Sequence, residues 1–394
     1  MTTLLLALLG LLAAYAFYLA AVCSRRSRAP EDHLDAGQRL PGWAYAFAAT
    51  GVTLAVFEPF DHFRLLAAYG YQYNETVLGL ILVALCAALF QKRIWLASRI
   101  TASRTMGDLL GAYYASPAIR LYLLAVLFLF SVPLAAYFLG QAGDLLEAAS
   151  HGGIARLLGI GGIAVFLFLF SAIGGWRAVA FVVAGLAIVT LVLTMLLAGL
   201  AAVVFDVAAT IHGGIPAAKG ILTDSIPGVV QFTRGIGKEV PAGGIWTTTA
   251  GLSFAIAATG IVMSPGFGFL GITTRPRSSF ALSQVWITAG LAGGALLLLG
   301  PVFGAAMARM AAAATAEPAG AFTQFIDRLG AFDLFAAACF VVMIAGSLIL
   351  AISFFAASGA SIFTLEFLGA YLLPGLSSAG RRLAARLSLA GIYT

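Results

Sequence analysis

One apolar stretch, residues 43–69, is long enough to cross a lipid bilayer but carries charge and a proline in its middle. Its ionisable residues are Glu58, Asp61, His62 and Arg64, and Pro59 lies among them. Proline removes a helix hydrogen bond, and a charged side chain in hydrocarbon costs at least ~2.5–3.5 kcal/mol on insertion scales. Such a segment is stable only where protein or a water-filled cavity surrounds it, as in the broken helices with which transporters bind their cargo.

The composition of the whole chain also predicts a membrane protein. Of the 394 residues, 61% are hydrophobic and 10% are charged, and the mean hydropathy is +1.01, which excludes an ordinary soluble domain. Apolar runs near the ~20 residues that a bilayer helix needs recur throughout. We predict spans at residues 3–22, 43–69, 76–98, 119–147, 156–173, 178–205, 245–271, 280–308 and 333–358, and the start of a tenth near 383.

The distribution of Lys and Arg predicts the orientation of these spans. If the N-terminus lies outside and the spans alternate, most of the 22 basic residues fall on the inner side, and every short inner loop contains one. Positive charge favours the cytoplasmic side of a membrane. We therefore expect a multi-pass protein of the cell inner (plasma) membrane with its N-terminus outside. The net charge of +6 reflects this topology and not a nucleic-acid surface, since the basic residues are scattered between helices.

A second interruption occurs in the span 245–271, where Pro265 lies between Ser264 and Gly266. In the predicted topology this span and the span 43–69 run in opposite directions across the membrane. Two broken helices of opposite direction, separated by four spans, are typical of an inverted repeat with a binding site at its interface. The alternative is two unrelated proline kinks, which are common in membrane helices.

The sequence contains no motif for nucleotide, metal or nucleophilic chemistry. A P-loop, a dinucleotide fingerprint, HExxH, paired metal-binding cysteines and Gly-x-Ser-x-Gly are all absent. The four histidines are scattered over loops and one helix, which does not suggest a metal site. We therefore predict that the protein is not an enzyme, has no cofactor and does not bind nucleic acid.

Several segments, taken in order, resemble the sodium:solute symporter family. The first broken span opens with residues 41–43 (PGW), much as the family's first core helix does. The family's short inner segment is similar to residues 105–113 (TMGDLLGAY), and part of its third core helix is similar to residues 134–137 (LAAY). Its Gly-Gly turn is similar to residues 174–179 (GGWRAV). The last of these is the most specific motif. In the third core helix the family usually has Gln where Tyr137 stands. The resemblance covers about residues 40–375.

The resemblance implies an all-α polytopic membrane protein with a LeuT-like fold, an inverted-repeat helical bundle of five plus five core helices. Residues 1–394 would form a single transmembrane domain, with 3–22 as an extra N-terminal helix, 43–205 as the first repeat and 245–394 as a partial second repeat. The chain reaches about 12 residues into the expected ninth core helix, too few to cross a ~30 Å core. We expect either a truncated product or a partner that supplies the missing helices.

The chain departs from this family at the expected sodium site. The family holds sodium with backbone carbonyls of the first broken helix and a hydroxyl pair on the eighth core helix, which suits a hard cation. One alignment of residues 333–358 places Phe354 and Phe355 at the hydroxyl pair, and another places Leu350 and Ala351 there. Three serines lie nearby: Ser353, Ser358 and Ser361. We therefore do not expect a standard sodium site.

Glu58 is a second departure, because the family carries mostly neutral residues in this stretch. A carboxylate at membrane depth can take up a proton, since burial disfavours its charged form. Glu58 is thus a candidate for binding Na+ or H+ as coupling ion, with Asp61 and His62 lining an outer vestibule. Alternatively, the charged residues neutralise one another at a wet external interface.

These observations lead to a secondary active transporter, similar to a symporter, that moves a small polar or anionic solute across the inner membrane. The predicted substrate-binding residues are Thr53, Ala55, Phe57, Glu58, Tyr137, Ser264 and Phe267. The predicted ion-binding residues are Glu58, Ala55, Ser353 and Ser358. The expected partners are the solute and the lipid bilayer. The alternatives are a membrane sensor or input module of a signalling protein and a non-transporting fragment.

Overall fold

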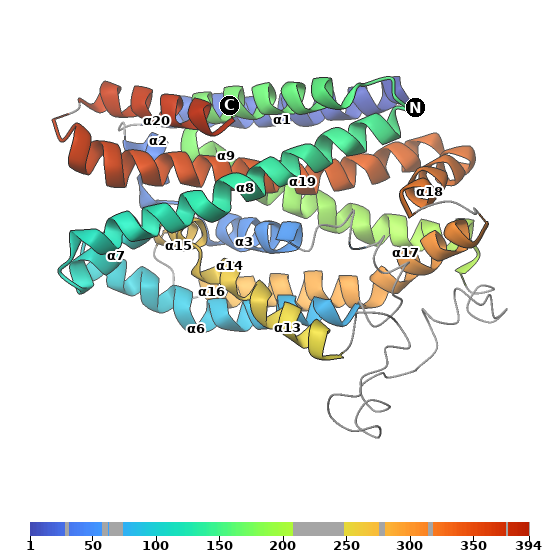
Figure 1. Ribbon diagram of the computed structural model, residues 1–394, viewed down its shortest axis with the longest axis horizontal. Coiled ribbons are helices and arrows are strands. Elements are labelled where there is room, and N and C mark those ends of the chain that lie inside the picture. Colours follow the sequence, from blue (N-terminus) through green and yellow to red (C-terminus); the bar gives the residue numbers. More distant parts are fainter. Residues whose placement is uncertain are drawn as a thin grey trace.

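The computed structural model describes residues 1–27, 31–56, 62, 74–207, 248–275, 280–313, 318–375 and 377–393. Within these ranges the chain is helical, and its only extended pairing is an isolated parallel bridge between Leu40 and Thr274. Most helices run along one direction of the molecule (Figure 1). The all-α fold class predicted from the sequence is confirmed for this part of the chain.

The first part of the chain contains α1 (Thr2–Arg26), α2 (Glu31–Asp35), the 3₁₀ turn η1 (Ala36–Gln38), α3 (Gly42–Val56), η2 (Glu75–Val77), α6 (Leu78–Ile100), α7 (Met106–Tyr113), α8 (Pro117–Ala149) and α9 (Arg156–Val204). The second part contains α13 (Thr248–Ala258), α14 (Gly260–Met263), α15 (Pro265–Ile272), α16 (Phe280–Val285), the π-helix η3 (Trp286–Gly293), α17 (Gly294–Ala313), α18 (Pro318–Phe332), α19 (Leu334–Phe363), the π-helix η4 (Thr364–Leu372) and α20 (Ser378–Tyr393).

Six of the described helices are long and apolar enough to cross a membrane, and a bent helix pair adds a seventh. The pair joins residues 252–263 to 265–272 at an angle of 51°. It coincides with the broken span expected around Pro265. The predicted span near 383 corresponds to α20, a helix of 16 residues. The structure therefore agrees with a multi-pass membrane protein.

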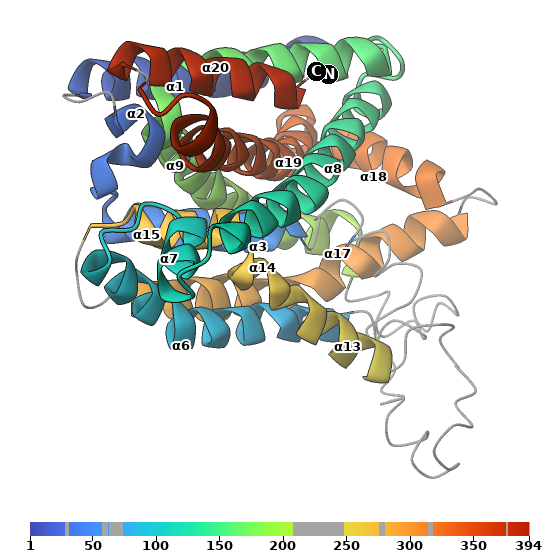
Figure 2. The same ribbon diagram turned by 60° about the vertical axis from the view of Figure 1, so that its left-hand side comes forward.

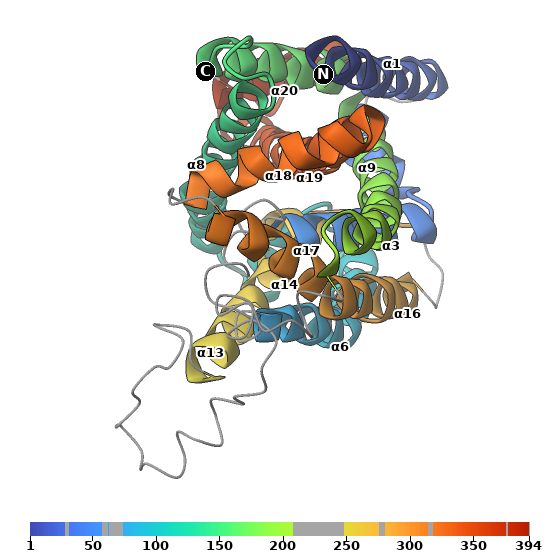
Figure 3. The same ribbon diagram turned by 90° about the vertical axis from the view of Figure 1, so that its right-hand side faces the viewer.

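Helix α19 lies at the centre of the bundle. It packs against α8 and α9, with α1 and α20 on one side and α3 on the other (Figures 2 and 3). Of the residues in its most apolar 18-residue stretch, 89% are buried. A helix that is apolar on all faces is suited either to the lipid or to the centre of a bundle, and the burial of α19 shows that it occupies the centre. The many Ala, Gly and Ser residues of α19 let these neighbours approach closely.

A sharp kink divides α9 at the Gly-Gly turn, between the predicted spans 156–173 and 178–205. Gly175 has φ +66° and ψ −171°, a conformation that favours glycine. A Cβ at Gly175 would also lie only 2.6 Å from Nδ1 of His33, so α2 packs directly on the kink. The next residue, Trp176, packs its ring against Phe269 and Phe354, with centroid distances of 5.1 and 5.7 Å. The turn therefore ties α9 to α2, α15 and α19.

Burial of His33 predicts a pH-dependent stability. Burial, together with the nearby Arg386 and Arg382, lowers the pKa of His33 to about 4. The unfolded chain therefore binds one proton more than the folded chain between about pH 4 and 6.5, and the free energy of unfolding falls as the pH drops through this window. We expect a loss of roughly 2–3 kcal/mol between pH 7 and 4.5. Denaturant titration in detergent, repeated with His33→Asn, should show a flatter profile for the variant.

His151 provides the matched control, because its side chain is 55% exposed and pairs with Asp327 on the surface. His151→Asn should keep the pH profile of the parent protein. Equal slopes for the parent and His33→Asn would contradict the prediction.

Candidate functional site

The break between α14 and α15 is formed by Ser264 and Pro265. Ser264 has an extended backbone, with ψ at 143°, and Pro265 is the first residue of α15. The Ser264 hydroxyl accepts a hydrogen bond from the Phe267 N–H at 3.3 Å and donates one to the Ile261 carbonyl at 2.7 Å. One hydroxyl thus satisfies backbone groups on both sides of the break. The N-terminal end of α15 remains directed into the bundle.

A buried glutamine on α6 supports the same break. Gln91 is fully buried, and its Nε2 donates to the Val262 carbonyl at 3.0 Å. This carbonyl lies where the helix is interrupted, so its intrahelical partner is lost. In a bilayer such a group must find a protein partner. Gln91 was not predicted as a site residue, although an amide within the apolar span 76–98 is a signal that could have identified it.

Helix α19 faces the break with Ser358. A Cβ at Gly266 would lie 2.8 Å from the Ser358 hydroxyl, so the two chains are in close contact there. The hydroxyl itself donates to the Phe355 carbonyl at 3.3 Å. Phe267, on the first turn of α15, is fully buried. The structure therefore brings three predicted site residues, Ser264, Phe267 and Ser358, to one region.

The middle of α3 meets a hydrocarbon side chain on α19. A Cβ at Gly51 would lie 2.8 Å from Ala187 and 3.3 Å from Leu350. Leu350 is one of the positions where the family resemblance would place a sodium-binding hydroxyl. The nearby Ser353 hydroxyl donates to the Ile349 carbonyl of its own helix at 2.6 Å. The contact between α3 and α19 is thus apolar at Leu350, one of the two alternative positions that the resemblance gives for the hydroxyl pair.

The remaining predicted residues are distributed differently. Thr53 and Ala55 are fully buried on α3, and the Thr53 hydroxyl donates to the Ala49 carbonyl at 2.8 Å. Tyr137 on α8 is 47% exposed and packs on Phe138, so it lies at the surface of the described bundle.

Other predictions concern residues outside the described part of the chain. Phe57 and Glu58 fall there, as do Asp61 and Arg64. His62 is described and is 1% exposed. It therefore does not fit the alternative in which this group of charged residues is wet at an interface.

Helix α3 and the broken helix α14–α15 are joined by backbone pairing at one end of the bundle. We call this the α7 end, since α7, α2 and the last residues of α15 lie there (Figure 1). The Leu40 N–H donates to the Thr273 carbonyl at 3.1 Å, and the Arg275 N–H donates to the Leu40 carbonyl at 2.7 Å. The segment before α3 is thereby fixed to the segment after α15.

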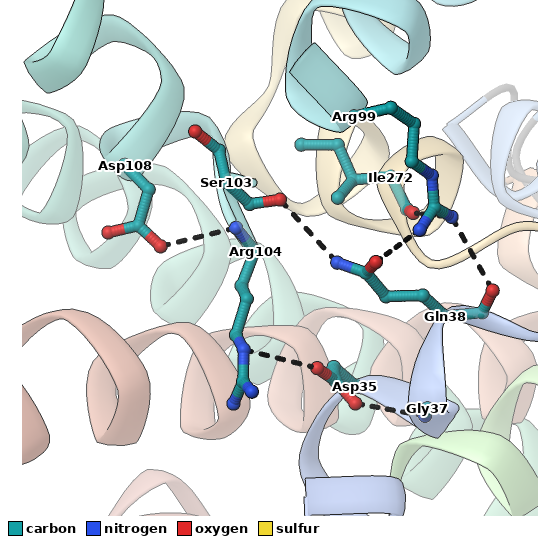
Figure 4. A network of polar contacts seen from close by, with 8 residues as sticks. All are labelled: Asp35, Gly37, Gln38, Arg99, Ser103, Arg104, Asp108 and Ile272. Carbon is teal, nitrogen blue, oxygen red and sulfur yellow. Dashed lines mark hydrogen bonds and ion pairs between the residues drawn. The ribbon is translucent and has the colours of Figure 1, made fainter. Parts of the chain in front are cut away.

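Arg99, at the C-terminal end of α6, holds this junction together (Figure 4). Its guanidinium donates to the carbonyls of Thr274 at 2.9 Å, Ile272 at 3.3 Å and Gln38 at 3.4 Å, and it also contacts the Gln38 side chain. The Trp95 ring lies 5.4 Å from the guanidinium, and its Nε1 donates to the Thr274 carbonyl at 3.1 Å. A cation that binds several carbonyls closes the α7 end more firmly than neutral contacts would.

A polar hollow of about 390 Å³ lies beside Arg99. Asp35, Gln38, Ser98 and Arg104 contribute to its lining. Arg104 approaches Asp35 at 3.9 Å, and Gln38 Nε2 donates to the Ser103 carbonyl at 3.5 Å (Figure 4). The elements η1, α6, α7 and α15 therefore meet in a polar network, in contrast to the apolar centre of the bundle.

The first turn of α7 links this network to η4. The Gly107 N–H donates to Oε1 of Glu366 at 3.1 Å, and Glu366 is 2% exposed. The Thr105 hydroxyl caps α7 by accepting from the Asp108 N–H at 3.0 Å. Asp108 also pairs with Arg120 of α8 at 2.6 Å. A carboxylate at a helix N-terminus is favourably placed, because the helix dipole is positive there.

Sequence reasoning assigned no site role to Gln38, Arg99, Trp176 or Glu366. Arg99 contributes only to the predicted topology of positive charges, and Trp176 only to the Gly-Gly motif. Their roles depend on contacts between residues far apart in the chain.

One comparison with solved structures gives a close match in fold. A Na+-coupled sialic acid symporter, in its substrate-bound outward-open state, superposes with a TM-score of 0.74 at 15% sequence identity. The match covers 99% of this chain and 80% of the symporter. No protein-family model and no curated protein sequence matches the chain. The chain therefore shares the fold of a sodium-coupled symporter, and at this identity the likeness establishes the fold alone.

Loss of the Arg99 side chain should open the α7 end. In a variant without Cys23, Cys86 and Cys339, we place a cysteine at the buried Ser98, which lines the polar hollow. A hydrogen bond to a charged group contributes ~1.5–3 kcal/mol, and about 1.4 kcal/mol is a factor of ten in an equilibrium. Arg99→Ala should therefore raise the labelling rate of that cysteine by a membrane-impermeant maleimide at least about tenfold.

Arg93 lies exposed on the same helix and serves as the control. Arg93→Ala should leave the labelling rate within about twofold of the parent, as expected for a surface substitution. Similar rates for both variants would show that Arg99 does not close this end.

Gly107 should not tolerate a larger side chain. Both carboxylate oxygens of Glu366 lie against the position that a Cβ would occupy. Gly107→Ala would displace the carboxylate from the Gly107 N–H and leave it buried without this donor, at a cost of ~1–3 kcal/mol. The matched control is Gly161→Ala, since a Cβ at Gly161 meets open space. Thermal unfolding should show a loss for Gly107→Ala only, and equal effects at the two positions would contradict the prediction.

Proposed function

We propose that the protein is a secondary active transporter that moves a small polar or anionic solute across the inner membrane. The observation that carries this proposal is the pair of helices, α3 and α14–α15, whose ends are joined by Leu40, Thr273 and Arg275 at the α7 end. An interrupted helix that is held by protein contacts inside the membrane is typical of transporters that bind cargo at such breaks. The likeness in fold to a sodium-coupled symporter supports the same conclusion.

The solute would bind near the N-terminal end of α15. The amide groups and the dipole of a helix N-terminus favour negative charge, which suits an anionic or strongly polar group. Ser264, Phe267 and Ser358 lie in this region, and Thr53 and Ala55 lie on the facing helix α3. We propose these residues, with Phe57, Glu58 and Tyr137, as the substrate-binding set.

Transport would require the α7 end to open and close. In the present structure Arg99 and Trp95 hold the carbonyl of Thr274, so a path through this end is blocked by direct hydrogen bonds. With the N-terminus outside, the α7 end would be cytoplasmic, and its closure would prevent the release of solute to the inside. Breaking the Arg99 bonds would release the solute to the inside.

We propose a proton, bound at Glu58, as the coupling ion in preference to sodium. The apolar contact of Leu350 with Gly51 supports this choice, because a hard cation needs oxygen ligands that this contact lacks. Ala55, Ser353 and Ser358 are the other candidates for ion contacts, and the Ser353 and Ser358 hydroxyls already donate to carbonyls of α19.

The apolar contact between Leu350 and Gly51 also favours a second candidate function, that of a membrane sensor. A bundle that binds a solute without an ion site could report occupancy through the α7 end without moving the solute. Solute binding without accumulation in vesicles would identify this function.

The uptake of radiolabelled small solutes into proteoliposomes tests the proposal. We expect accumulation under an inward proton gradient and at least a ~100-fold lower rate for Glu58→Gln, as is typical for the loss of an essential acid–base group. A sodium gradient alone should have no effect. Sodium-driven uptake that Glu58→Gln leaves unchanged would contradict the coupling mechanism.

The exposed acid Asp327 supplies a control, since it is 51% exposed and pairs with His151. Asp327→Asn removes the same charge and should leave uptake unchanged. If no solute accumulates under either gradient while binding is detected, the sensor function replaces transport.

A further inference from the structure

A second, smaller polar hollow lies at the α7 end, and neither α3 nor α14–α15 contributes to its lining. It is bounded by α2, the kink of α9, α19 and α20, and its polar lining comes from His33, Ser171, Ser361 and Arg386. Its volume of about 20 Å³ is just above what one water-sized group needs. α2 packs on both α9 and α20, so three parts of the chain that are distant in sequence meet here.

Two buried donors without a partner lie here: Ser171 lines the hollow, and Arg382 lies outside its lining but close enough to His33 to lower the pKa of that imidazole. The Ser171 side chain is 3% exposed, and its hydroxyl has no hydrogen-bond partner in the described part of the chain. The Nε of Arg382 is likewise buried and unpaired among the described residues. Buried polar groups are nearly always hydrogen-bonded, so these two groups point to a bound molecule.

The charge at the hollow is positive. Arg386 is anchored by a hydrogen bond from its Nε to the Ala172 carbonyl at 2.9 Å, which leaves its other guanidinium nitrogens available at the exposed rim. Arg382 and Arg386 both disfavour a proton on His33, whose pKa lies near 4, so its imidazole is neutral and can donate one hydrogen bond. None of the residues that line the hollow is an acid.

The kink of α9 adds to this positive field. Gly175 interrupts the helix, and the segment that begins at Trp176 directs its N-terminal end toward the hollow, which both residues line. The dipole of a helix segment favours an anion near its N-terminal end. An ordered water would satisfy Ser171 but would not account for two guanidinium groups beside a helix N-terminus.

We propose that this hollow binds the phosphate group of an anionic phospholipid. One phosphate oxygen would enter the hollow and accept from Ser171 and His33, while Arg386 and Arg382 bind the outer oxygens in the bidentate manner typical of arginine. In the predicted topology the hollow lies at the inner leaflet, where basic pockets between helices bind anionic head groups. The lipid would fasten α2, and so the start of α3, to α9 and α20. This inference does not depend on transport.

Lipid retention by the purified full chain tests the proposal. The protein is exchanged from detergent into nanodiscs that contain equal parts of phosphatidylglycerol and phosphatidylcholine, then re-extracted, and bound lipid is counted by native mass spectrometry. We expect one phosphatidylglycerol per protein in preference to phosphatidylcholine. The double variant Arg382→Ala/Arg386→Ala should retain at least about tenfold less, as expected for the loss of two charge-assisted contacts.

The matched control is Lys92→Ala/Arg93→Ala, which removes the same charge from two exposed positions of α6 on the same predicted side of the membrane. It should retain phosphatidylglycerol like the parent. Ser171→Ala and Arg386→Lys, which preserve packing, keep the test valid if the double variant does not fold, and both should weaken retention. Equal retention of the two lipids by the parent, or equal retention of phosphatidylglycerol by the parent and all variants, would overturn the proposal.

Inorganic phosphate distinguishes the two sources of the anion. Up to high millimolar concentration it should compete with the lipid but should not replace its stabilising effect in thermal unfolding. If phosphate alone stabilises the protein and phosphatidylglycerol adds nothing, the site takes a free anion and the lipid proposal is wrong.

Discussion

Every interrupted helix in a bilayer leaves backbone donors and acceptors that water cannot satisfy, and this constraint organises the molecule. At the break before α15, the Ser264 hydroxyl and the Gln91 amide supply the missing partners. At the α7 end, Leu40 pairs with Thr273 and Arg275, and Arg99 and Trp95 bind the neighbouring carbonyls. Polar side chains thus supply the partners that the irregular backbone needs.

The apolar part of the structure obeys a different rule. α19 is surrounded on nearly all sides, so its contacts are set by the size of the facing residues and not by polarity. Gly51 of α3 lets Ala187 of α9 approach to a distance that a Cβ would not allow, and the end of the Leu350 side chain packs beside it. Leu350 fills the space between α3, α9 and α19, and the burial of its apolar side chain stabilises the bundle. A bound ion and its ligands would take the place of this side chain. This packing explains how the bundle can keep a symporter fold without a hydroxyl pair at this position.

The sequence was sufficient to predict the elements but not the contacts that close the site. Hydropathy located the spans, and Pro265 and Gly175 located the break and the kink, because these signals are local. The sequence predicts two spans, 156–173 and 178–205. In the structure both belong to α9, which continues through the kink at Gly175. By contrast, Arg99 bonds to residues 173 and 175 positions away, and Glu366 to a residue 259 positions away. No periodicity or motif reports such pairs, and an arginine near a helix end is equally consistent with a charge that only sets topology.

The hydrogen bonds of Arg99 and Trp95 at the α7 end also help to explain how two chains that are only 15% identical in sequence can share one fold. Arg99 and Trp95 bind carbonyl oxygens of Gln38, Ile272 and Thr274, which every residue type presents in the same way. The side chains at these acceptor positions are therefore free to change while the junction is kept. Only the donor side chains, Arg99 and Trp95, and the path of the backbone must be preserved. The positions of glycine and proline and the lengths of the helices determine that path. A contact network of this kind places few demands on sequence, so a likeness in structure outlasts a likeness in residues.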